Sequence, residues 1–114
     1  MVEIKNIHFA TSIAVLFALK EARGHKTLQE TYADIGRMTS FEDMLEFLRI
    51  SYEKGENKKV DSEEFIELIA VSGIGFLKVT TIFNQVIEGI LYGGMSQEEV
   101  ESSKKQLQAK IPQT

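Results

Sequence analysis

The sequence predicts an all-α protein, a single small domain of about five to six helices. Proline occurs once in 114 residues and glycine is sparse outside expected boundaries, so few residues oppose helix formation. Strand signals are poor, because only residues 2–5 alternate between apolar and charged side chains. The longest amphipathic stretch, residues 76–92, is expected to be the central helix against which the rest folds.

Composition and charge exclude several classes of protein. Hydrophobic residues at 43% and charged residues at 26% are ordinary for one soluble globular domain. The absence of cysteine excludes disulfides and thiolate metal sites and favours a reducing cell interior. A net charge of −4 disfavours non-specific binding to nucleic acid. The longest apolar run, residues 13–19, is too short to cross a bilayer and lacks signal-peptide flanks, so we expect no membrane partner.

The first helix is expected to begin at Thr11 or Ser12 and to end before Gly24. Its middle is apolar nearly all round, which has two interpretations. It is a buried core helix, or it leaves one face, with Val15 and Leu19, for another chain. The second interpretation follows because a domain of this size rarely encloses a helix completely.

Two capping signals predict the next two helices. Thr27 and Glu30 have capping-box spacing, so a short helix is expected from there to Ile35. Ser40 begins the next helix in the same way, and Gly55 is expected to end it.

The helix after Ser40 carries apolar residues on two sides. The expected core stripe comprises Phe41, Met44, Leu45, Leu48 and Tyr52. Phe47 and Ile50 lie on the far side, three positions apart, where solvent is expected. A pair of exposed apolar residues at helical spacing indicates a contact surface.

The second half of the chain contains three more helix signals. Residues 61–64 cap a helix that residues 72–75 break or bend before the central helix begins. Gly93 and Gly94 end the central helix. Ser96 then opens a polar helix to about residue 108, which would be marginal alone. We therefore expect a helical core domain at residues 1–95 and a C-terminal helix and tail at residues 96–114. This C-terminal segment is expected to be mobile or to pack only against a partner.

Residues 53–65 have some features of a calcium loop. If Glu64 were the twelfth position, Glu53 would be the first and Gly55 the third, while Lys58 replaces the glycine of the sharp turn. A charged loop between helices is therefore favoured over a calcium site.

Residues 69–82 resemble a helix-turn-helix. Gly73-Ile74 would form the turn, and Val79 and Ile82 match core positions of the second helix. Ile69 stands where a small residue usually lets the helices cross. The second helix, which would be the recognition helix, would also present one lysine and no arginine to DNA.

Catalytic and metal-binding patterns are missing from the sequence. His8 and His25 are solitary and lack the spacing of zinc ligands, so each is interpreted as a polar residue beside a helix. No nucleophile triad, phosphate loop or dinucleotide fingerprint occurs. We expect a non-enzymatic protein without cofactor or metal, whose function comes from its surfaces.

The order of the helices and three segments resemble a known family. The segments are Ile4 with Ile7-His8-Phe9, residues 41–48 (FEDMLEFL) and residues 61–66 (DSEEFI), followed by a long amphipathic helix with a polar tail. The pattern resembles tail assembly chaperones of siphophages, particularly those of phages of lactic-acid bacteria. The likeness covers nearly the whole chain. The chain departs from some relatives in lacking a clear N-terminal β-hairpin.

The resemblance implies an α-helical chaperone that binds and shields the tape measure protein before tail tube subunits polymerise around it. It implies self-association into an open or spiral oligomer, contact with the tail tube protein, and work in the host cytoplasm rather than in the mature virion. Candidate partner-binding residues are Val15, Leu19, Phe47 and Ile50. The alternatives are a small helix-turn-helix regulator of DNA and a structural adaptor in a larger assembly.

Overall fold

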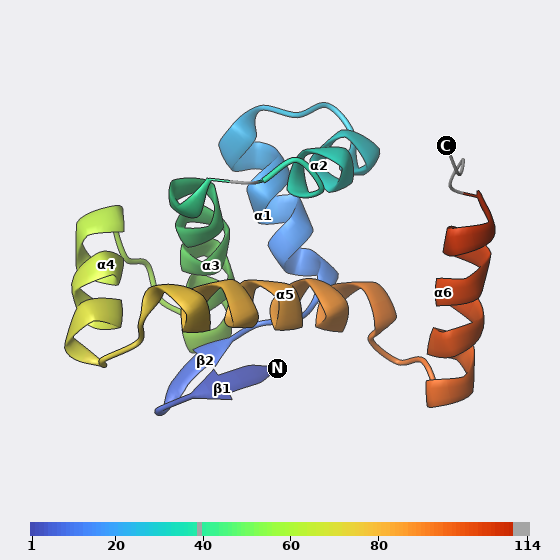
Figure 1. Ribbon diagram of the computed structural model, residues 1–114. Coiled ribbons are helices and arrows are strands. Elements are labelled where there is room, and N and C mark those ends of the chain that lie inside the picture. Colours follow the sequence, from blue (N-terminus) through green and yellow to red (C-terminus); the bar gives the residue numbers. More distant parts are fainter. Residues whose placement is uncertain (39, 111–114) are drawn as a thin grey trace.

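The computed structural model describes residues 1–38 and 40–110, with side chains through residue 106. Within them the chain forms six helices and a two-stranded hairpin, which confirms the expected all-α fold (Figure 1). The elements are β1 (Val2–Ile4), β2 (Ile7–Phe9), α1 (Ile13–Arg23), α2 (Leu28–Ile35), α3 (Phe41–Glu56), α4 (Ser62–Val71), α5 (Phe76–Tyr92) and α6 (Gln97–Lys110). The end of the expected C-terminal tail, residues 111–114, lies outside the described residues.

Helices α3 and α5 cross at the centre of the fold (Figure 1). Helix α3 contacts β2, α1, α4 and α5, whereas α5 lies across α3 and also contacts β1 (Figure 1). Helix α5 has the expected bounds and buries one face, formed by Val79, Ile82, Phe83 and Val86. The predicted central helix thus shares its position with α3, which is apolar on two sides and packs against neighbours on both.

Side-chain caps begin α2, α3, α4 and α6 as the sequence predicts, whereas the Ser12 side chain before α1 makes no cap hydrogen bond. Thr27, Ser40 and Asp61 each accept a hydrogen bond from the backbone N–H three residues on, over 3.1, 3.1 and 2.8 Å. Ser96 does the same for α6 over 3.2 Å. Each bond satisfies one of the free N–H groups of a first helical turn.

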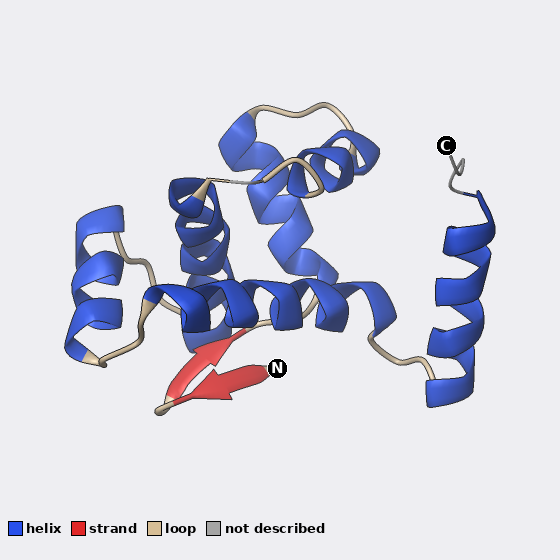
Figure 2. Ribbon diagram, viewed as in Figure 1, coloured by secondary structure: helices blue, strands red, loops and turns tan. Residues whose placement is uncertain are grey.

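The N-terminal β-hairpin that the sequence did not predict is present (Figure 2). Its strands are antiparallel, with Ile4 opposite Ile7. Lys5 and Asn6 both have left-handed φ values, 49° and 67°. Two such residues are what a tight two-residue hairpin turn requires, and Asn tolerates this conformation better than most residues. Strand β2 packs on α3, and this contact holds the hairpin against the helices.

Gly55 does not end α3, contrary to the sequence prediction. The helix continues past it and ends at Asn57, which has a left-handed φ of 53°. A Cβ at Gly55 would collide with the His8 carbonyl oxygen and lie 2.9 Å from the Ala10 nitrogen. Two hydrogen bonds join Ala10 to Ser51 across the same contact, at 3.0 and 2.7 Å. Glycine here allows the hairpin to lie directly on the helix.

Helix α6 stands beside the rest of the molecule rather than within it (Figure 1). A turn closed by a 3.0 Å bond from the Met95 N–H to the Tyr92 carbonyl precedes it, and Gly94 has a φ of 81°. The ammonium group of Lys104 lies 5.4 Å from the Tyr92 ring centre. No element pair that includes α6 is among the closely packed pairs of the described chain.

Candidate functional site

The four residues predicted to contact a partner are buried. Val15, Leu19 and Phe47 have no exposed surface, and Ile50 is 4% exposed. The expectation that Phe47 and Ile50 face solvent was therefore wrong. Helices α1 and α5 both pack on α3, and the Phe47 ring meets Phe83 edge to face at 5.2 Å. Helical periodicity identified the two apolar faces of α3 but could not tell how many neighbours would cover them.

Other apolar side chains are exposed, and four of them flank the turn between α4 and α5. Leu77 is 78% exposed, Val71 76%, Phe76 62% and Ile66 50%. We call these four residues the α4–α5 patch. Exposed apolar residues scattered singly are normal, whereas several in one helix-turn-helix segment indicate an interaction surface.

The turn beneath this patch is held firmly. Ile74 is buried at its centre, and its N–H donates to the Ile69 carbonyl over 3.2 Å. Gly73 supplies the left-handed φ of 72° that this helix end requires. The Lys5 ammonium group donates to the Ser72 carbonyl over 2.7 Å, which joins the hairpin to the turn. The apolar side chains are therefore displayed from an ordered support.

Phe76 extends the patch towards α3. Its ring stacks on Phe41 with centroids 4.5 Å apart and 25° between the planes. Offset stacking of aromatic rings adds roughly 0.5–1.5 kcal/mol to the area they bury. Phe76 is therefore oriented although more than half of its surface is exposed.

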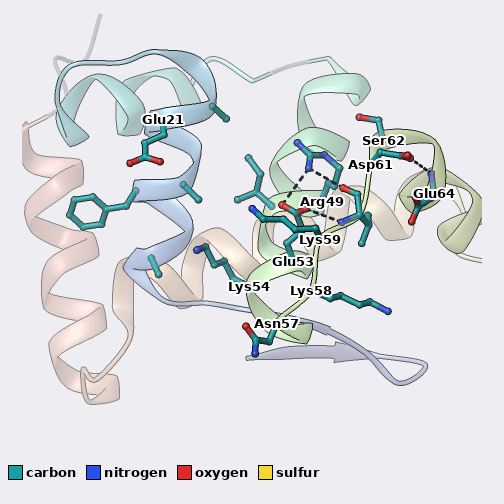
Figure 3. A pocket seen from close by; sticks show the side chains of 16 residues that line it. Glu21, Arg49, Glu53, Lys54, Asn57, Lys58, Lys59, Asp61, Ser62 and Glu64 are labelled. Atoms are coloured by element: carbon teal, nitrogen blue, oxygen red, sulfur yellow. Dashed lines mark hydrogen bonds and ion pairs between the residues drawn. The ribbon is translucent and has the colours of Figure 1, made fainter.

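A groove of about 1280 Å³ lies on another side of the molecule, between α1, α3 and the loop that leads to α4 (Figure 3). Ala14, Ala18 and Ala22 form its wall on α1, and Ile50 on α3 also lines it. Alanines at intervals of four residues lie on one helix face, where their small size permits close approach of another helix.

Charged residues of both signs line the groove. Arg49, Glu53, Lys54 and Lys59 lie on the side of α3 and the loop, Glu21 lies on α1, and Asp61 and Glu64 lie at the start of α4 (Figure 3). A hydrogen bond with the Tyr52 hydroxyl raises the pKa of Lys58. The groove therefore carries interleaved charges of both signs.

Glu53 and Arg49 hold the loop that borders this groove. The Glu53 carboxylate accepts a hydrogen bond from the Val60 N–H over 2.9 Å and lies 3.4 Å from Arg49. Arg49 donates in turn to the Val60 carbonyl over 3.3 Å. Glu53, the first position of the calcium-loop alternative, thus has a structural role. Among the residues described, no group of three or more His, Cys, Asp or Glu could hold a metal ion.

An ion cluster joins α1, α2 and α3. Arg23 lies 3.2 Å from Asp34, 2.9 Å from Asp43 and 3.1 Å from Glu46. Burial lowers the pKa of Arg23, but the hydrogen bond to Asp43 and the charges around it more than compensate, so the pKa is raised. The hydrogen bond from Arg23 lowers the pKa of Asp43, and the bond with Ser40 adds to this.

Both histidines bond within the chain. The His8 ring lies 2.7 Å from a Glu56 carboxylate oxygen, and the His8 N–H donates to the same oxygen over 3.0 Å. The His25 ring nitrogen lies 3.0 Å from the Thr31 hydroxyl. Sequence reasoning could not find these pairs, because the partner of His8 lies 48 positions away.

The segment that resembles a helix-turn-helix has the matching angle. Helices α4 and α5 meet at 115°, within the range of that motif. Ile69, Ile74, Val79 and Ile82 are all buried. The exposed first turn of α5 presents Phe76, Leu77 and Lys78, so its outer surface is mainly apolar.

Membrane-spanning potential is restricted to one bent pair. In residues 1–38 and 40–110 no single helix is long and apolar enough to cross a membrane. Helices α4 and α5 together reach that length and composition, but they meet at 115°.

Comparison with known proteins leaves the surfaces of this chain as the guide to its function. No protein-family model, curated protein or solved structure matches it.

Proposed function

We propose that this chain is a non-enzymatic phage tail assembly chaperone, which binds and shields the apolar helical tape measure protein before the tail tube polymerises. The α4–α5 patch is the observation that carries the proposal. It replaces Val15, Leu19, Phe47 and Ile50 as the candidate contact surface, because those four residues are buried.

The α4–α5 patch suits an amphipathic helical client. Val71 and Leu77 are each more than three-quarters exposed in the free protein. Fully covering an aliphatic or aromatic side chain is worth roughly 1.5–3 kcal/mol relative to leaving it in water. A client helix with apolar residues at every third and fourth position could cover several of these side chains at once. The patch therefore offers enough apolar surface for reversible binding.

The remaining features of the molecule fit a shielding role. A net charge of −4 keeps the outward surface hydrated after the apolar patch is covered. A client longer than one domain needs several copies, so the proposal includes self-association along it. Contact with the tail tube protein and action in the host cytoplasm complete the proposal.

Co-expression with a tape measure protein segment, followed by co-purification, tests the proposal. Val71→Glu with Leu77→Glu places two charges on the patch without changing the core, and should reduce co-purification by about tenfold or more. Ile13→Glu with Tyr32→Glu is the matched control, because both residues are about half exposed or more and lie on α1 and α2. Capture that is unchanged by the patch variant would contradict the assignment.

A DNA-binding regulator is the second candidate, favoured by the 115° angle between α4 and α5. Salt dependence separates the two candidates. Retention on DNA through phosphates must fall steeply as salt rises, whereas apolar binding to a helical client does not. A fixed oligomer that ignores both DNA and tape measure segments would instead indicate a structural adaptor.

A further inference from the structure

The outer face of α4 carries acidic as well as apolar side chains. Ile66, Ala70 and Val71 are exposed on this helix, and so are Glu63 and Glu67. Residues three and four positions apart lie on the same face of a helix, so positions 63, 66, 67 and 70 form one surface. The part of the α4–α5 patch that α4 contributes is therefore bordered by two carboxylates.

Both carboxylates are available to a partner. Within the side chains that the structure describes, neither Glu63 nor Glu67 forms a hydrogen bond or an ion pair. Asp61 and Glu64 instead line the groove on α1 and α3, where Lys58 also lies. A cation brought by a client can therefore pair with Glu63 or Glu67 without displacing a group of this chain.

Cations near the patch come from α5 and the hairpin rather than from α4. Lys78 follows Leu77 and is the only basic residue of α4 and α5. Lys5 reaches the turn between these helices, where it donates to the Ser72 carbonyl. The border of the patch is therefore acidic on α4 and basic beyond the turn.

We propose that the client of the α4–α5 patch is an amphipathic helix whose apolar stripe is bordered by lysine or arginine, and that Glu63 and Glu67 select this border. The inference rests on the proposed function, because it specifies the client of the same surface. Contact with the apolar side chains favours any helix that has an apolar stripe, whereas an acidic border would be repelled by the two carboxylates. Helix α4 has 10 residues and is about 15 Å long, so about three turns of such a helix can lie along it.

Two synthetic peptides measure this selection. Both are helices of about 18 residues with one leucine stripe, because shorter isolated helices are unstable in water. One carries lysine beside the stripe, and the other carries glutamate at the same positions. Fluorescence anisotropy with the full-length chain at low salt should give roughly tenfold tighter binding of the lysine peptide. The difference should shrink as salt rises, because salt screens the charges but not the apolar contact.

Charge reversal on α4 should invert the preference. With Glu63→Lys and Glu67→Lys together, the glutamate peptide should become the tighter ligand, and this gain also shows that the variant keeps a folded surface. Glu98→Lys with Glu101→Lys is the matched control, because both residues are exposed and the net charge changes equally. These residues lie on α6, at the opposite end of α5 from α4 (Figure 1), so the control should retain the preference for lysine.

Equal binding of the two peptides by the native chain would overturn the inference, and so would binding of neither. An inverted preference in the α6 control would overturn it as well, because net charge rather than the two carboxylates would then select the peptide. The proposed function is tested separately by capture of the tape measure segment, which Val71→Glu with Leu77→Glu should weaken. Loss of that capture together with equal peptide binding would reject the basic border and leave the client surface in place.

Discussion

Gly55 illustrates how a single residue can be fixed by a contact far along the chain. Replacing it with alanine should raise helix propensity by about 1 kcal/mol, yet the new Cβ would press on the backbone of His8 and Ala10. Backbone atoms of a hydrogen-bonded strand cannot move aside easily. We expect Gly55→Ala to lower the free energy of unfolding by roughly 1–3 kcal/mol in chemical denaturation.

Gly36→Ala is the control for this substitution. Gly36 has ordinary right-handed helical angles, and its nearest obstacle is the Ala33 carbonyl oxygen at 3.5 Å. That substitution should be neutral or slightly stabilising. Equal effects at both positions would contradict the close packing of the hairpin on α3.

Glu56 links stability to pH through its bonds to His8. The hydrogen bond with the His8 ring, followed by the bond with its N–H, lowers the pKa of Glu56 below its ordinary value of 4.5. The carboxylate is thus stabilised on folding, and this contribution is complete above pH 4.5 and lost as the pH falls through the folded-state pKa. Glu56→Gln should lower the Tm at pH 7 and weaken its decline on acidification.

The comparison for Glu56→Gln is Glu67→Gln. Glu67 is exposed on α4, so its replacement changes the net charge equally while keeping the contact with His8. Thermal unfolding monitored by circular dichroism between pH 3 and 7 distinguishes the two variants. If their curves coincide, the bond between Glu56 and His8 contributes nothing to acid stability.

Sequence reasoning at the residue scale succeeded where the physical cause is local. Thr27, Ser40 and Asp61 were identified as caps because a cap bonds to an N–H three residues away. The roles of Gly55 and Glu56 depend on the packing of residues 8–10, more than forty positions away in sequence. No pattern near those residues reveals such contacts.

Among the elements, the N-terminal hairpin depends most on its turn. Lys5 and Asn6 both hold left-handed angles, and Lys5 also bonds to the turn before α5. Asn6→Gly should retain or increase stability, because glycine adopts this conformation without a steric cost. Asn6→Val should cost about 1–2 kcal/mol in chemical denaturation, because a β-branched residue is strained there. Equal stabilities would show that the turn has another conformation.

The helices show which information a single sequence carries. Their ends were predicted closely because caps, glycines and periodicity are local signals, and α5 has its expected bounds. The sequence did not reveal that α3 shares the centre with α5, because that position depends on contacts with β2, α1 and α4. The predicted exposure of Phe47 and Ile50 failed for a similar reason. Both residues lie on a second apolar face of α3, and tertiary packing covers that face.

Across the whole molecule, the α4–α5 patch is the surface that we propose binds the client. The α4–α5 patch offers exposed apolar side chains on an ordered turn, which suits a helical client. Several copies that associate along a long tape measure protein would present the patch repeatedly.

Hydrogen exchange on the complex with a tape measure segment tests the central claim most directly. The amide groups around the α4–α5 turn, from the second half of α4 to the first turns of α5, should exchange more slowly in the complex than in the free protein. The hairpin residues 2–9 serve as an internal reference. Protection confined to other elements, or unchanged exchange around Val71 and Leu77 at saturating segment, would contradict the assignment of this patch as the client-binding surface.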